Sequence, residues 1–174
     1  MYRLLIADDE QITRKAIRML VDKYVPEITE IFEADSGRAA IELAANVHPD
    51  LICMDIKMPG IDGLEAARSI CTTAPNTSVI IISAYDEFSF AKDALSLGIN
   101  HYLLKPISKT EFLAAVQDIL EKKGLQKKRA DSHYQLKEQV YKVQRELDRQ
   151  ITYSLMIGDM DRLEDYRYFE TIGG

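Results

Sequence analysis

The sequence predicts an α/β fold: a doubly wound, five-stranded parallel sheet with a C-terminal helical extension. Short apolar runs alternate with amphipathic stretches through residue 121, which is typical of parallel strands joined by helices on both faces of a sheet. The run LICM at residues 51–54 is apolar at every position, as expected for a strand covered on both faces. The predicted strand order is 2-1-3-4-5, the arrangement of flavodoxin-like folds.

The predicted elements follow in order along the chain. Apolar runs predict five strands, at residues 2–7, 30–34, 50–54, 78–83 and 100–104. Apolar residues with a period of 3.6 predict helices between them, at residues 12–24, 37–46, 64–73 and 88–97. Gly98 suits the C-cap of the fourth helix. Ser108 suits the N-cap of a fifth helix, because Glu111 follows three residues later in a capping-box pattern.

Beyond Gly124 the apolar pattern continues as a stripe. Its members, three or four residues apart, are Leu136, Val140, Val143, Leu147, Ile151 and Leu155. The stripe spans about two heptads, fewer than a coiled coil normally needs, and it predicts one long helix that pairs with another apolar surface. We expect that surface to be the twin helix of a homodimer, through residues 130–157. The chain's own front domain and an output domain outside this chain are the alternatives.

Composition and charge limit the classes of function. No apolar run approaches the roughly 18 residues of a membrane span, and the N-terminus lacks the apolar core of a secretory signal. We therefore expect a cytoplasmic protein with no membrane partner. Cys53 and Cys71 show neither metal-ligand nor disulfide spacing. Residues 1–120 hold 11 Lys and Arg against 18 Asp and Glu, a balance of −7, which argues against direct nucleic-acid binding by this part.

Acidic residues end two of the predicted strands. Asp8 and Asp9 follow the first strand and Asp55 follows the third. A lone acid in such a place can simply begin a turn or favour a helix N-terminus. Strands 1 and 3 are neighbours in the predicted sheet, however, so their acids should converge at its C-terminal edge, where open α/β sheets bind ligands. Carboxylates that close repel one another, and a bound Mg²⁺ ion would relieve the repulsion.

The fourth and fifth predicted strands end in a hydroxyl and an amine, those of Ser83 and Lys105. A lysine at a strand end can be an ordinary edge charge, but all four polar strand ends fall on one rim of the predicted sheet. Together they supply a nucleophilic carboxylate, a cation site, a hydroxyl donor and a positive charge. Those are the parts of phosphoryl transfer to a side chain.

The order and spacing of these motifs resemble the receiver domain of two-component response regulators over residues 1–121. The matching segments are Asp8-Asp9, MDIKMPGIDG around Asp55, SAYD from Ser83 and LLKP around Lys105. The stretch YDEFSFAKDALSLGINHYLLKPIS further resembles the YesN-like subgroup, whose receivers are joined to AraC-type DNA-binding domains. Residues 122–174 would then be a helical linker and dimerisation segment, leading to an output domain beyond Gly174.

The resemblance implies a role for each matching acid. Asp55 would accept a phosphoryl group from a phosphohistidine of a sensor histidine kinase. Asp9 and Asp55 would bind Mg²⁺ together with the backbone carbonyl of Lys57, and Asp8 would act through a water. Lys57 departs from the uncharged polar residue of some relatives, so its ammonium is a candidate modifier of the phosphoaspartate lifetime.

The resemblance also implies a conformational switch. Lys105 would contact the phosphoryl oxygens, and its peptide bond to Pro106 would be cis. Ser83, in place of the Thr of many relatives, would move inward to hydrogen-bond the phosphoryl group. Tyr102 would turn inward into the space that this opens, although an ordinary strand aromatic is the alternative interpretation.

Three functions are compatible with the sequence. The first is a response regulator that controls transcription through a DNA-binding domain outside this chain; the end at ETIGG, directly after a linker-like helix, favours it. The second is a stand-alone receiver that acts by protein contact. The third is a Mg²⁺-dependent phosphohydrolase, but such enzymes usually have a second acid two residues after the nucleophile, where this chain has Lys57. We expect a phosphoacceptor that assists its own phosphoryl transfer, not an enzyme.

Overall fold

The computed structural model describes residues 1–84, 99 and 101–157. The chain divides into two compact units, Met1–Lys122 and Lys123–Gly174. The helix predicted at residues 88–97 and its cap at Gly98 lie outside the described residues. Within the described part, no helix combines the length and the apolar character needed to cross a membrane.

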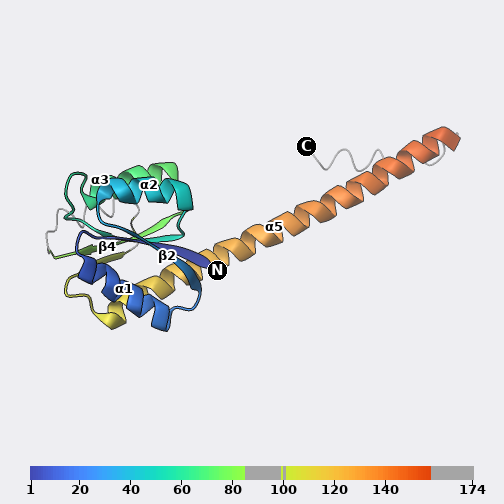
Figure 1. Cartoon of the computed structure of the whole chain (residues 1–174). Coiled ribbons are helices and arrows are strands. Elements are labelled where there is room, and N and C mark those ends of the chain that lie inside the picture. Colours follow the sequence, from blue (N-terminus) through green and yellow to red (C-terminus); the bar gives the residue numbers. More distant parts are fainter. Residues whose placement is uncertain (85–98, 100, 158–174) are drawn as a thin grey trace. The chain divides into compact units, whose positions relative to one another are not determined.

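The first unit contains a five-stranded sheet in the order β2-β1-β3-β4-β5, with every neighbouring pair parallel (Figure 1). The strands are β1 (Tyr2–Ala7), β2 (Ile28–Ala34), β3 (Leu51–Asp55), β4 (Ser78–Ser83) and β5 (His101–Leu104). The predicted fold class and strand order are confirmed. β2 begins earlier than predicted, because the exposed Thr29 and Glu30 of this edge strand interrupt the apolar pattern after Ile28.

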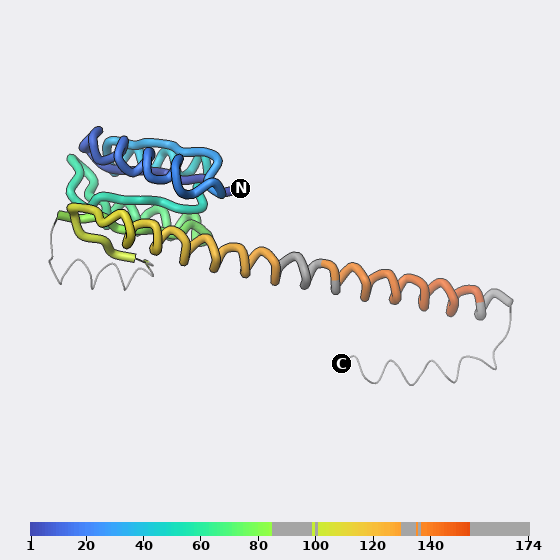
Figure 2. Tube along the Cα trace, turned by 90° about the horizontal axis from the view of Figure 1, so that it is seen from below, coloured from blue at the N-terminus to red at the C-terminus, as the bar shows by residue number. Residues whose placement is uncertain are grey.

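Helices connect the first four strands in turn, and another follows β5. They are α1 (Gln11–Tyr24), α2 (Gly37–Val47), α3 (Gly63–Thr73) and α5 (Lys109–Ile157), and the path from strand to helix can be followed in Figure 2. The carboxylate of Asp62 accepts a hydrogen bond from the N–H of Glu65 and caps α3. The predicted cap at Ser108 is confirmed, because its Oγ accepts from the N–H of Glu111 at 3.4 Å.

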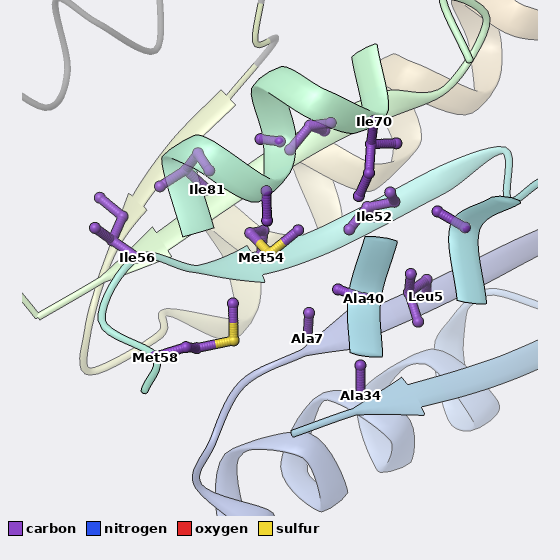
Figure 3. Close-up of a cluster of buried hydrophobic side chains, with 14 of the residues drawn as sticks. Leu5, Ala7, Ala34, Ala40, Ile52, Met54, Ile56, Met58, Ile70 and Ile81 are labelled. Atoms are coloured by element: carbon purple, nitrogen blue, oxygen red, sulfur yellow. The ribbon is translucent and has the colours of Figure 1, made fainter. Parts of the chain in front are cut away.

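Helices cover both faces of the sheet (Figure 1). On one face, side chains from the strands point toward α2 and α3 (Figure 3), and Leu5, Ile52 and Ile70 in this cluster are at most 1% exposed. On the other face, α1 and the first turns of α5 bury Ile17 and Phe112 against the sheet. Burial of both faces explains why β3 has no polar residue before its terminal acid.

The predicted helix beyond Gly124 is confirmed, and it is continuous with the predicted fifth helix, because α5 runs through Gly124 over 49 residues. In the second unit, three members of the predicted apolar stripe have exposed side chains: Val140 (56%), Val143 (61%) and Leu147 (41%). The side chains of Leu136 and Leu155 lie outside the described residues. Apolar surface left in water costs roughly 25 cal/mol per Å² relative to burial, so this stripe is suited to being covered.

Candidate functional site

Two buried carboxylates lie at the C-terminal edge of the central strands. Asp55 is the last residue of β3, in register with Ile82 of β4, and it is 5% exposed. Asp8 directly follows β1, the other neighbour of β3, and is 1% exposed. The next residue, Asp9, is exposed. The acids therefore lie at the edge predicted from the strand order, with Asp9 on the solvent side.

The Lys105 ammonium lies between the two buried acids. Its Nζ is 2.9 Å from Oδ1 of Asp55 and 2.9 Å from Oδ2 of Asp8. The backbone N–H of Lys105 donates to the carbonyl of Ser83 at 2.7 Å, which ties the lysine to the end of β4. The peptide bond between Lys105 and Pro106 is cis, as the resemblance predicted. A single cation thus contacts both carboxylates at the rim of the sheet.

These contacts shift the pKa values of the partners. Burial raises the pKa of Asp55 and the charges of Asp8 and Asp9 add to the rise, while the hydrogen bond and charge of Lys105 oppose it. Burial acts to lower the pKa of Lys105, but its hydrogen bonds to Asp8 and Asp55 outweigh that effect and raise the pKa. Lys105 is therefore protonated at neutral pH and offsets only part of the acidic charge, which leaves the edge suited to a further cation.

The backbone after Asp55 is held by the start of α3. The N–H of Gly63 donates to the carbonyl of Ile56 at 2.8 Å. A β-carbon at position 63 would overlap the carbonyl oxygen of Asp55, so only glycine allows the helix to approach the strand this closely. The position of the Asp55 backbone thus depends on a residue without a side chain.

The remaining predicted residues lie around the same edge. Ser83 ends β4, is 1% exposed and is in register with Leu104 of β5. Tyr102 lies within β5, opposite Ile81, and is partly buried. The Lys57 side chain is exposed in the segment between β3 and α3. The structure therefore places Ser83 at the rim with the acids. Tyr102 lies three residues before Lys105 in the chain.

Two residues near the acids were not predicted from the sequence as part of the site. Glu10 has its Oε2 at 3.7 Å from the Nζ of Lys105, and its N–H donates to Oδ1 of Asp8 at 2.9 Å. Arg14 of α1 donates to the backbone carbonyls of Asp8 and Asp9. Glu10 could have been predicted, because it is the third acid in the run DDE. The contacts of Arg14 could not, because they depend on how α1 packs.

The oxygen donors at this edge suit a hard divalent cation. Among residues 1–84, 99 and 101–157, no three His, Cys, Asp or Glu side chains gather into a ready-made metal cluster. A site would therefore rely on the carboxylates of Asp9 and Asp55, supplemented by backbone carbonyl and water oxygens. Mg²⁺ is commonly bound in this way, by one or two carboxylates and several waters. The charge of Asp9 acts on the pKa of Asp55, so the two carboxylates are within electrostatic reach.

Comparison with known proteins identifies the family. The model of the response regulator receiver domain matches residues 4–117. The chain belongs to this family. The chain is similar to the uncharacterized transcriptional regulatory protein YesN of Bacillus subtilis (strain 168), at 32% identity over 133 residues, which cover 76% of this chain and 35% of YesN. The matched region spans 28% of the length of the regulatory protein AtoC of Escherichia coli (strain K12), so the chain covers only part of the length of these curated relatives.

Solved structures share the fold of this receiver domain. The REC domain of AraT, a response regulator from Geobacillus stearothermophilus, is 36% identical with a TM-score of 0.67, over 72% of this chain and 98% of that one. A chain from the crystal structure of the CheX–CheY–BeF₃–Mg²⁺ complex from Borrelia burgdorferi is 27% identical with a TM-score of 0.63, over 68% of this chain and 89% of that one.

Proposed function

We propose that the receiver domain accepts a phosphoryl group on Asp55 from the phosphohistidine of a sensor histidine kinase, with Mg²⁺ as cofactor. The observation that supports this most directly is the contact of the Lys105 ammonium with the buried carboxylate of Asp55, at 2.9 Å. A nucleophile beside a fixed cation is what phosphoryl transfer requires, because that reaction depends mainly on positioning and charge neutralisation. The related chain from Borrelia burgdorferi was crystallised as part of a CheX–CheY–BeF₃–Mg²⁺ complex.

The proposed step is a displacement at phosphorus. A carboxylate oxygen of Asp55 forms a bond to phosphorus, while the bond from phosphorus to the imidazole nitrogen breaks and its electron pair remains on the imidazole. Lys105 would pair with the phosphoryl oxygens. Asp9, Asp55 and the backbone carbonyl of Lys57 would hold Mg²⁺, with Asp8 acting through a water, and the ion when bound neutralises charge on the phosphoryl group.

We assign the switch to Ser83 and Tyr102. The Ser83 hydroxyl, buried at the end of β4, would turn toward the phosphoryl group, and the partly buried Tyr102 would occupy the space left behind. The amide shifts of Tyr102 and Leu103 should therefore change on phosphorylation of the wild-type protein, and unchanged shifts would contradict the assignment.

The output is proposed to be transcriptional. YesN is described as an uncharacterized transcriptional regulatory protein, which supports a role in transcription. The resemblance of residues 85–108 to the YesN-like subgroup is the reason to propose an AraC-type DNA-binding domain beyond this chain as the element that contacts DNA. The receiver itself has an excess of acidic residues, which argues against its binding DNA directly. We propose that it acts through protein contact in the cytoplasm. Deleting the AraC-type domain from a longer protein should abolish DNA binding in a gel-shift assay, and binding retained by residues 1–174 would contradict this division.

Phosphorylation can be tested without the kinase. The protein is incubated with acetyl phosphate, and intact-mass measurement should show one added phosphoryl group when Mg²⁺ is present and none after chelation with EDTA. Peptide mapping should locate the group on the peptide that contains Asp55. No uptake with Mg²⁺, or uptake at another residue, would refute the proposal.

We also propose that the helix of the second unit pairs with its copy in a homodimer. Val140, Val143 and Leu147 lie at helical spacing and are each at least 41% exposed in the single chain, and a second copy offers the same stripe. A regulator that reads two half-sites on DNA would also need such symmetry. The proposed interface covers residues 130–157.

Charges placed in the stripe should separate the dimer. The double variant Val143→Glu with Leu147→Glu should sediment as a monomer, because four glutamates would have to be buried in the dimer interface. The control Tyr141→Glu with Thr152→Glu adds the same charge roughly a third of a turn away from the stripe and should remain dimeric. Both variants should still be phosphorylated. A wild-type protein that is monomeric at high concentration would contradict the dimer.

A further inference from the structure

We propose that Arg14 is a positioning residue of the phosphorylation site, which holds the backbone on both sides of Asp9 so that the Asp9 carboxylate can bind Mg²⁺. This inference rests on the proposed function. Arg14 lies in the first turns of α1, directly after the segment that contains the acids. Its side chain is 13% exposed, so the guanidinium is directed into the protein and not toward a docking partner.

The guanidinium of Arg14 bonds the two peptide units that flank Asp9. Nη1 is 2.7 Å from the carbonyl oxygen of Asp8 and 3.3 Å from that of Asp9. The first carbonyl belongs to the peptide unit before the Asp9 α-carbon and the second to the unit after it. Since these two planes define the backbone dihedrals of Asp9, one side chain restrains the direction in which the Asp9 carboxylate projects.

Glu33 of β2 anchors the other side of the guanidinium. The Nε of Arg14 is 3.3 Å from Oε2 of Glu33, and the Nε of Arg18 is 2.6 Å from Oε1. The hydrogen bond from Arg18 is the main cause that lowers the pKa of Glu33, with Arg14 adding to it, so Glu33 is ionised at neutral pH. Arg14 therefore links the acidic segment to a strand of the sheet through charge-assisted hydrogen bonds.

Arg18 provides a matched control. It pairs with the same Glu33 carboxylate, but its second contact is from Nη2 to the carbonyl of Ile31 at 3.0 Å, on β2. Removing Arg18 takes away an ion pair between α1 and β2 without touching the backbone of Asp8 or Asp9. A difference between the two arginine variants therefore reports on the acidic segment and not on packing of the helix.

The test measures Mg²⁺ affinity directly. In ¹⁵N-labelled protein without phosphodonor, Mg²⁺ is titrated and the amide shifts of Asp9 and Glu10 are followed. Groups that orient metal ligands typically contribute 10- to 100-fold to affinity, so Arg14→Ala should weaken Mg²⁺ binding by about tenfold, whereas Arg18→Ala should bind as the wild type does. Arg14→Lys, which keeps one donor group for one carbonyl, should fall between them.

Phosphorylation by acetyl phosphate gives a second readout. Arg14→Ala should need more Mg²⁺ for half-maximal rate yet reach the wild-type rate at saturating Mg²⁺, because Asp55 and Lys105 are unchanged. Without Mg²⁺, the melting temperature should fall to a similar degree in Arg14→Ala and Arg18→Ala.

The outcomes separate the two proposals. Equal Mg²⁺ affinity in Arg14→Ala, Arg14→Lys and Arg18→Ala would overturn the role of Arg14 while leaving the phosphorylation site intact. A wild-type protein that neither binds Mg²⁺ nor takes up a phosphoryl group would instead refute the proposed function.

Discussion

The Asp55→Asn variant should take up no phosphoryl group from acetyl phosphate at any Mg²⁺ concentration. An amide oxygen is a far weaker nucleophile than a carboxylate oxygen, and the substitution also removes one of the two acids proposed to hold Mg²⁺. The side chain keeps its size at the end of β3, so the sheet should be preserved. Intact-mass measurement over the time in which the wild-type protein is fully phosphorylated checks the result.

Asp50→Asn is the matched control for this experiment. Asp50 directly precedes β3, at the opposite end from Asp55, and its Oδ2 accepts a hydrogen bond from the N–H of Arg3 at 2.8 Å. The amide oxygen of asparagine can accept the same bond. This variant should therefore be phosphorylated as fully as the wild-type protein, and uptake that is lost in Asp50→Asn but kept in Asp55→Asn would contradict the assignment.

The elements with the strongest apolar patterns were the most predictable. β3 and β4 are buried at nearly every position, so their apolar runs identified them directly. β2 lies at the edge of the sheet, and its exposed positions hid its first residues. Gly124 was a possible break in the sequence, but α5 passes through it. A glycine inside a helix costs only about 1 kcal/mol relative to alanine, and the helical segments on both sides of Gly124 outweigh that cost.

The residues at the rim were predictable because parallel strands share a direction. Asp8, Asp55 and Lys105 each stand at the end of a strand, so the strand order alone places them at one edge. The pairing of Lys105 with both acids could not be derived, since it depends on side-chain geometry across three strands. The contacts of Arg14 were hidden for a similar reason: they connect a helix to a loop and to a strand. The roles of these residues in phosphorylation stay predictions.

The Gly63→Ala variant should lose about 3 kcal/mol of the free energy of unfolding, the upper part of the range for overpacked sites. The new β-carbon would overlap the carbonyl oxygen of Asp55 and lie 2.8 Å from its carbonyl carbon. Both are backbone atoms, so no change of side-chain rotamer can relieve the overlap. α3 would have to move away from β3, at the expense of the 2.8 Å hydrogen bond from Gly63 to Ile56.

Gly60→Ala is the control that distinguishes the steric overlap at Gly63 from the general cost of replacing a glycine. Gly60 has a φ of 84°, but a β-carbon there would have no atom within 4 Å, so its substitution should cost only about 1–2 kcal/mol of left-handed strain. The melting temperature should fall further in Gly63→Ala than in Gly60→Ala, with a decrease on the order of 10 °C. Gly63→Ala should also be phosphorylated more slowly than Gly60→Ala, because the displaced backbone belongs to Asp55 itself. Equal melting temperatures and equal rates would show that α3 can shift without disturbing the end of β3.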